Sequence, residues 1–238
     1  MSPPILAIDT ASSLCSAAVG RENVDAFLVS RESRRHADEV LPMIEQVLKT
    51  SSLTLSDLAA IAIVAGPGSF TGLRIGTAVA QGLAFGCDLP VVPVSSLAMM
   101  ARHARHELDI PLIAACVMHA REDEYYFALY RDQNSDAPLA VIQDCMVSLE
   151  YLEQELGNII EPFARSGEEV LLIGPDWSGD AMNRVAGKRA SPYSTSPDAR
   201  CLWSVAVQLF SRGDAVDAAD ATPVYLKDDM AYRKVKEL

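Results

Sequence analysis

AGPGSFTGLRIG, residues 65–76, joins an apolar strand to a helix through a turn rich in glycine and proline. Gly66 and Gly68 allow backbone angles that a side chain would forbid. Ser69 or Thr71 can cap the helix that follows, because a hydroxyl oxygen accepts hydrogen bonds from first-turn amides. The remaining amides of that turn favour an anion or the carboxylate of a partner. The segment therefore predicts a strand, a tight turn and a capped helix.

The helix after this turn is unusually poor in charge. Between Leu58 and Cys87, Arg74 is the only charged residue. A helix on the surface of a soluble protein normally presents a polar face to water. Small residues instead form two lines along this helix, namely Gly72, Gly76, Ala80 and Ala84, and Ala78, Gly82 and Gly86. We expect a helix that is buried on more than one side, with one side covered by another chain.

The composition limits the classes of partner. The chain has 238 residues, of which 50% are hydrophobic, and a formal net charge of −12. That length allows one large domain or two small ones. The negative charge argues against direct binding of RNA or DNA, because affinity for phosphates comes largely from Lys and Arg. Any contact with nucleic acid is therefore expected through a more basic partner.

The cysteines and the absence of targeting signals indicate the compartment. The five cysteines are scattered, and no two of them form a CxxC pair. The N-terminus lacks the basic segment of a secretory signal, and no apolar stretch is long and uninterrupted enough for a membrane span. These features predict reduced thiols and a cytoplasmic protein.

Strand and helix patterns follow one another in an order that repeats. Strands are expected at 4–11, 14–20, 23–30, 61–64 and 91–94, and again at 112–118, 124–131, 140–146 and 170–173. Helices are expected at 38–49, after the turn at 65–71, at 95–107, at 151–156 and at 199–212. Two copies of a βββαβα pattern indicate an internal duplication. We therefore predict an α/β protein with an N-terminal lobe at 1–106, a C-terminal lobe at 107–221 and an extended arm at 222–238.

Four segments carry a resemblance to a known family. ILAIDTASSLCSAAV (5–19), AGPGSFTGLRIG (65–76), AQGLAFG (80–86) and PVYLK (223–227) resemble the TsaB (YeaZ) family. The resemblance implies the actin-like ATPase superfold with two RNase H-like lobes. It also implies a role in making N6-threonylcarbamoyladenosine at position 37 of tRNA. In that system TsaB is the non-catalytic partner of the transferase TsaD, and TsaE is the associated ATPase.

The same resemblance implies that this chain is not itself an enzyme. TsaD carries a metal-binding HxxxH motif, and two histidines four apart on a helix can hold one metal. Ser96 and Met100 occupy the corresponding positions here. The resemblance therefore implies no catalytic residue and no metal in this chain. The alternatives to this non-catalytic role are an ATPase that uses Asp9, a metallopeptidase, or a sugar or acetate kinase of the same superfold.

The resemblance also points to a partner interface on two helices, 37–50 and 72–86. In the TsaB family these helices meet the equivalent pair of TsaD, and they self-associate into a homodimer when TsaD is missing. The residues expected in that interface are Leu41, Met43, Ile44, Val47 and Leu48 on the first helix, and Gly72, Arg74, Ile75, Gly76, Val79, Ala80 and Leu83 on the second. The alternative is that both helices simply pack on the sheet.

A polar turn after the first strand is a candidate for weak nucleotide contact. Asp9, Thr10, Ser12 and Ser13 lie there, and in actin-like ATPases the equivalent turn approaches the nucleotide phosphates while its Asp orients Mg²⁺ through water. ATP or ADP with Mg²⁺ would then bind at low affinity, or only within the complex. The alternative is that these side chains satisfy the amides of their own turn. A second departure from the family pattern is His119, which stands where an Asp is usual.

Overall fold

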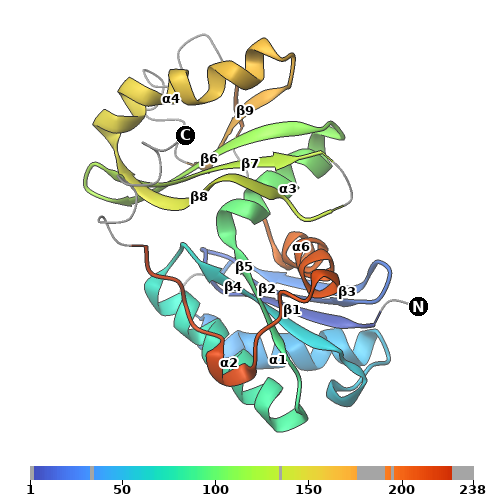
Figure 1. Cartoon of the computed structure of the whole chain (residues 1–238). Coiled ribbons are helices and arrows are strands. Elements are labelled where there is room, and N and C mark those ends of the chain that lie inside the picture. Colours follow the sequence, from blue (N-terminus) through green and yellow to red (C-terminus); the bar gives the residue numbers. More distant parts are fainter. Residues whose placement is uncertain (1–2, 33–34, 134–135, 176–190, 194–195, 227–238) are drawn as a thin grey trace. The chain divides into compact units, whose positions relative to one another are not determined.

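The computed structural model describes residues 3–32, 35–133, 136–175, 191–193 and 196–226, and they fall into two compact units. Unit 1 takes in the chain up to Met99 together with Pro197–Val224. Unit 2 takes in Met100–Ser196 and the chain from Tyr225 onward. Each unit is built round one five-stranded sheet (Figure 1).

The sheet of unit 1 mixes antiparallel and parallel strands. Its strands are β1 (Ile5–Asp9), β2 (Cys15–Gly20), β3 (Val24–Ser30), β4 (Ala60–Gly66) and β5 (Val91–Ser95), in the order β3-β2-β1-β4-β5. β1 and β2 pair antiparallel, as do β2 and β3, whereas β1, β4 and β5 run parallel. Every residue of β1 and β4 is buried, because these central strands are covered on both faces.

Helices cover the two faces of this sheet. Alternate residues of a strand point to opposite faces. Leu6 and Ile8 join the core formed with α1 (His36–Thr50) and α2 (Phe70–Cys87). Ser16 lies on the opposite face, where its hydroxyl accepts a 3.0 Å hydrogen bond from the first amide of α6 (Ala199–Arg212). The 3-10 turns η1 (Leu55–Asp57) and η3 (Ala218–Asp220) complete the unit.

Unit 2 repeats the same topology. Its strands are β6 (Leu112–Arg121), β7 (Glu124–Asp132), β8 (Leu139–Ser148), β9 (Val170–Ile173) and β10 (Ser191–Tyr193), in the order β10-β9-β6-β7-β8. β6, β7 and β8 pair antiparallel, and β6, β9 and β10 pair parallel. Strand for strand this is the pattern of unit 1, which confirms the predicted duplication. α4 (Leu149–Arg165) packs over this sheet with Leu152, Leu156 and Ile160 buried.

The units differ from the predicted lobes at their final helices. α3 (Ser96–Leu108) was expected to close the N-terminal lobe, yet from Met100 onward it belongs to unit 2. α6 was expected in the C-terminal lobe but packs against β1 and β2 of unit 1, where the indole nitrogen of Trp203 donates to the Gly20 carbonyl at 3.2 Å. Helical periodicity predicts which face of a helix is buried, but it does not reveal which sheet buries it.

Three smaller expectations also differ. α4 has 17 residues rather than the predicted six of 151–156, since its buried apolar stripe continues past Gly157 to Ile160. β10 was not predicted. The predicted arm at 222–238 is described only to Leu226, and its remainder lies outside the described residues. Within the described ranges, no helix is long and apolar enough to cross a membrane.

A buried ion pair fastens α3 in unit 2. The guanidinium of Arg102 donates to both carboxylate oxygens of Asp132, at 2.8 and 3.2 Å, and also to the Asp136 carbonyl. The side chains of Arg102 and Asp132 are 3% and 1% exposed, and Arg105 approaches the same carboxylate at 3.6 Å. Removing one member would leave a buried charge without compensation.

We expect Asp132→Ala to lower the free energy of unfolding by about 3–5 kcal/mol, the usual cost of an uncompensated buried charge. Equilibrium urea unfolding of the full chain measures this change. The control is Glu161→Ala, which removes an exposed pair with Arg165 (2.7 Å) on α4 and should have little effect. Equal losses in the two variants would contradict a special role for the buried pair.

Candidate protein interface on helix α2

The first turn of α2 is fixed against the turn that follows β1. Ser69 caps the helix, as its position predicts, by accepting a 3.3 Å hydrogen bond from the Gly72 amide. The Ser69 amide donates to the Ala11 carbonyl at 2.8 Å. The Thr10 hydroxyl donates to the Gly72 carbonyl at 2.7 Å, and this bond is buried. The two turns are therefore joined by one backbone hydrogen bond and one bond from the Thr10 side chain.

The first line of small residues on α2 packs inside unit 1. A Cβ atom on Gly72 would lie 1.9 Å from the Thr10 carbonyl oxygen, and one on Gly76 would lie 2.6 Å from the Thr10 hydroxyl. Ala80 and Ala84 are fully buried in the core. Gly72, Gly76 and Ala80 were predicted as interface residues, but their own unit covers them because the helix lies so close to β1.

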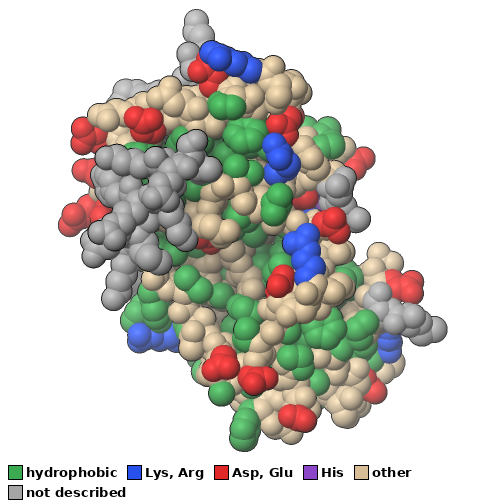
Figure 2. Space-filling view, in the orientation of Figure 1, with side chains coloured by type: hydrophobic (Ala, Val, Ile, Leu, Met, Phe, Trp, Pro, Cys, Tyr) green, Lys and Arg blue, Asp and Glu red, His purple; other side chains and the backbone are tan. Residues whose placement is uncertain are grey.

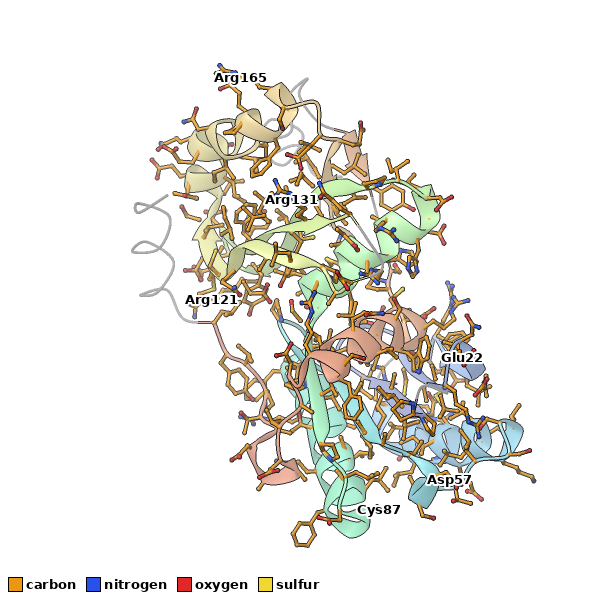
Figure 3. All side chains as sticks on the ribbon, turned by 45° about the vertical axis from the view of Figure 1, so that its right-hand side comes forward. Glu22, Asp57, Cys87, Arg121, Arg131 and Arg165 are labelled. Atoms are coloured by element: carbon orange, nitrogen blue, oxygen red, sulfur yellow. The ribbon has the colours of Figure 1, made fainter. Side chains whose placement is uncertain are left out.

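The second line of small residues faces outward. Ala78, Gly82 and Gly86 are exposed, and a Cβ atom on either glycine would meet nothing within 4 Å. Glycine inside a helix costs about 1 kcal/mol relative to alanine. Figure 3 marks the C-terminal end of this helix with Cys87. Since unit 1 does not need these two glycines, their absent side chains suit a helix from another chain.

Large apolar side chains stand at both ends of this outer line. Phe70 is 56% exposed at the first residue of α2, and Phe85 is 84% exposed near its last turn. The guanidinium of Arg74 lies 3.7 Å from the centre of the Phe70 ring, so the lone charge of the helix covers an aromatic face. Other hydrophobic side chains also reach the surface of unit 1 (Figure 2). We call the outer line with Phe70, Arg74 and Phe85 the α2 outer face.

The predicted interface residues of α1 divide into two groups. Ile44, Val47 and Leu48 are buried in the core of unit 1, which corrects the expectation that they face a partner. Leu41 is 51% exposed, and Met43 is half-buried. The apolar residues spread round α1 because the helix packs on the sheet along one side and against α2 along another.

The remaining predicted interface residues of α2 are Arg74, which is exposed, and three apolar residues that are neither fully buried nor fully exposed. Ile75, Val79 and Leu83 are half-buried and pack against the core of unit 1. These residues flank the α2 outer face and can widen it, so their place in an interface stays a prediction.

The candidate nucleotide turn is satisfied by its own chain. A carboxylate oxygen of Asp9 accepts from the Ala11 amide at 2.9 Å, and the Ser12 hydroxyl accepts from the Leu14 amide at 3.1 Å. The Ser12 carbonyl lies 2.9 Å from Nε2 of His36, the first residue of α1, while Ser13 is exposed. These bonds are those of the structural alternative, and the nucleotide contact stays a prediction.

Asp9 is nevertheless an unusual carboxylate. Its side chain is buried at the end of β1 with 3% of the residue exposed. Burial is the largest cause that raises the pKa of Asp9 to about 6; the Asp198 carboxylate acts in the same direction, while the Ala11 amide and His36 act in the opposite direction. Asp9 is therefore far easier to protonate in the folded protein than in an unfolded chain.

Ser96 and Met100 stand at the positions that correspond to the metal-binding histidines of TsaD. The Ser96 hydroxyl donates to the Pro67 carbonyl at 2.5 Å, and Met100 is 4% exposed. Neither residue supplies an imidazole or a carboxylate, so this pair does not fit a metal bound between two histidines. In the part of the chain that the structure describes, no three His, Cys, Asp or Glu residues are placed to hold a metal ion.

His119 has a structural role in the hairpin of β6 and β7. Its Nε2 lies 2.9 Å from the Glu122 carbonyl, and its ring meets Tyr125 edge-on at 5.3 Å between centroids. Glu122 has a φ of 46°, in the left-handed region. The imidazole therefore stabilises a tight turn at a position where the family usually has a carboxylate.

Comparisons with known proteins point to one pathway. A family model described as "TsaD: tRNA N6-adenosine threonylcarbamoyltransferase" matches residues 30–194. The Escherichia coli protein named tRNA threonylcarbamoyladenosine biosynthesis protein TsaB is 34% identical over 236 residues, with 97% of each chain covered. Its Haemophilus influenzae counterpart of the same name is 29% identical, with 97% of this chain and 96% of that protein covered.

A solved structure agrees with this likeness. YeaZ from Pseudomonas aeruginosa superposes with a TM-score of 0.82 at 31% sequence identity, covering 95% of this chain and all of that one. The similarity extends over both units. The predicted α/β fold of the actin-like ATPase type is thereby confirmed.

Matched glycine substitutions separate the two lines of α2. We expect Gly76→Ala to destabilise unit 1, because the new methyl group would meet the Thr10 hydroxyl at 2.6 Å. Gly82→Ala should instead stabilise the isolated chain by about 0.5–1 kcal/mol, since alanine is the better helix former and the site is open. Urea unfolding of both variants measures the difference, and a loss of stability in Gly82→Ala would show that the outer line is packed.

Asp9 should make stability depend on pH with a defined sign. Its folded pKa of about 6 exceeds the ordinary value of 3.8, so its favourable contribution is complete below about pH 4 and is lost as pH rises through 6. Asp9→Asn removes this dependence. As pH rises from 4 to 8, we expect the free energy of unfolding of the variant to increase relative to that of the wild type by up to about 3 kcal/mol, as measured by urea unfolding. Parallel pH profiles would contradict the raised pKa.

Proposed function

The chain belongs to the TsaB (YeaZ) family of tRNA threonylcarbamoyladenosine biosynthesis proteins, and we propose that it acts there as a non-catalytic subunit that binds a TsaD-type transferase through the α2 outer face. The contact would be helix against helix. Catalysis would then take place on the transferase and not on this chain.

The observation that carries this proposal is the pair of open glycines on α2. Gly82 and Gly86 bring the backbone of the helix to the surface, and Ala78 continues the same line. Small residues let two helices approach closely, so that dispersion contacts run along the backbone. Phe70 and Phe85 at the ends supply the large apolar side chains that anchor interfaces.

The likeness to TsaD supports the choice of partner. The TsaD family model matches residues 30–194, a range that contains both α1 and α2. A TsaD-type protein therefore has a segment related to this one and can present an equivalent helix. Two related faces of this kind can pair about an approximate two-fold axis, as in the isologous interfaces of dimers.

The absence of catalysis is proposed from the donor set on α3. Ser96 and Met100 stand at the positions where TsaD has its two metal-binding histidines, and the Ser96 hydroxyl is engaged by the Pro67 carbonyl. A thioether is a poor ligand for hard metal ions. The transfer of threonylcarbamoyl would accordingly take place on the partner.

The charge of the chain fits the same division of labour. With a net charge of −12, this subunit would contribute little to the phosphate contacts that hold tRNA. A basic partner would carry the tRNA, and the acidic surface would steer that partner toward the interface. The TsaE-type ATPase would join this larger complex.

A second copy of this chain is the competing occupant of the α2 outer face. The face is largely uncharged, so two copies can meet without bringing like charges together there. We propose that a homodimer forms through this face when the transferase is absent and that it dissociates when the transferase binds. Light scattering of the chain alone and of the mixture distinguishes the two states.

The test of the proposed function is Gly82→Arg. A long charged side chain on the open line should prevent close approach, so the dissociation constant for a TsaD homologue from the same organism should rise at least about tenfold. Isothermal titration calorimetry measures the affinity, and circular dichroism checks that the variant remains folded.

The matched control is Asn158→Arg, which adds the same side chain to an exposed position of α4 in unit 2. This variant should bind as the wild type does. Should the folded Gly82→Arg protein bind the transferase with undiminished affinity, the α2 outer face is not the interface. Enzyme-like turnover by the purified chain alone would overturn the non-catalytic role.

A further inference from the structure

The two flanks of α2 are covered by different parts of the chain. Val79 and Gln81 are two residues apart, so on a helix of 3.6 residues per turn they point to nearly opposite sides. Val79 lies on the flank that meets α1. Gln81 lies on the other flank, beside the segment Asp214–Val224, which we call the C-terminal strap. The α2 outer face lies between them.

The strap forms hydrogen bonds with other parts of unit 1 at three separate points. Val216 forms a two-residue bridge with Val91 of β5, with backbone hydrogen bonds of 2.8 and 2.9 Å. The side-chain amide of Gln81 donates to the Ala221 carbonyl at 2.9 Å. The Val224 amide donates to the Ala65 carbonyl at 2.8 Å, beside the turn that begins α2. In Figure 1 this red segment, which includes η3, runs beside α2.

The strap is also packed, and one glycine makes room for it. Ala221 is 1% exposed and belongs to the same core as Leu6 and Ile8. Gly66 has a φ of 135°, and a Cβ atom on it would lie 2.9 Å from the Val224 carbonyl oxygen. The strap therefore comes as close to the glycine turn as backbone can. This contact accounts for one of the glycines with which the turn begins.

We propose that the C-terminal strap is a positioning element for the partner interface. It holds α2 on the flank opposite α1, and Gln81 is the side chain through which it does so. This inference rests on the proposed function, because it concerns how the α2 outer face is presented to a transferase. It adds residues from the far end of unit 1 to the requirements of binding.

The physical reason is that contacts between small residues depend steeply on distance. A gap of less than 1 Å already forfeits a quarter to a half of the dispersion energy between facing atoms. The outer line of Ala78, Gly82 and Gly86 has no long side chains that could adjust to a displaced helix. A helix held from both flanks is preorganised, whereas a helix released on one flank must be ordered again on binding.

The first variant is Gln81→Glu. Glutamate keeps the size of glutamine but lacks the N–H donor, and its carboxylate would face the Ala221 carbonyl oxygen. We expect faster hydrogen exchange at the Val216 and Val224 amides and about a tenfold weaker affinity for the TsaD homologue, with the far-UV circular dichroism unchanged. Gln81→Lys restores an N–H donor and should recover part of the affinity.

The matched control is Gln154→Glu on α4 of unit 2. Gln154 is also a helical glutamine, and its side-chain amide donates a hydrogen bond to Glu150 at 3.1 Å. It belongs to unit 2, whereas the strap belongs to unit 1. It should leave the affinity unchanged. A second variant, Val216→Pro, removes the amide that bonds to Val91 and loosens the strap without altering α2. It should weaken binding in the same direction as Gln81→Glu.

Three results would overturn the inference or its premise. If hydrogen exchange shows the strap released in either variant while the affinity stays at the wild-type value, the strap does not position the interface. If Gln81→Glu weakens binding with the exchange of the strap unchanged, Gln81 acts by touching the partner itself. If the wild-type chain fails to bind any TsaD homologue, the proposed function fails first, and the strap variants have no part in that result.

Discussion

The contact between the turn after β1 and the first turns of α2 is the constraint on which the rest of unit 1 depends. The Thr10 hydroxyl binds the Gly72 carbonyl, and there is no space for a side chain on Gly72 or Gly76. This contact sets the rotation of α2 about its own axis. With one small-residue line turned toward the sheet, the other line is necessarily turned outward, so the packing of the core also determines which line is exposed.

Much of this architecture could be predicted from the sequence, because the chain repeats itself. The periods of the apolar residues located nine of the ten strands found among the described residues, and the repeat of βββαβα predicted the two sheets. The ends of α6 were predicted as they are found, since Asp198 caps its start and Gly213 ends it in the left-handed conformation. The destination of that helix could not be predicted. Its buried face would fit either of two similar sheets, and only tertiary contacts decide between them.

The candidate site was predicted in kind but not in detail. Two lines of small residues were visible on α2, yet spacing alone does not reveal which of two equivalent lines meets the core. The answer depends on Thr10, which lies 62 positions away from Gly72 in the chain. On α1 the resemblance placed Ile44, Val47 and Leu48 in the expected interface, but a helix packed on both a sheet and a neighbouring helix needs apolar residues on more than one side. The strap escaped prediction because its bonds are mostly made by backbone atoms.

The strap has a consequence for the order of events during synthesis. Domains generally fold as units while the ribosome is still translating, with N-terminal ones first. Unit 1 cannot follow that rule, because Ala221 belongs to its core and α6 packs on its sheet. All of unit 2 up to Ser196 is synthesised before the residues that complete unit 1. A nascent or truncated chain would thus lack α6 and the strap that complete unit 1. Under the proposed function, only chains that extend to Val224 would present a finished α2 outer face.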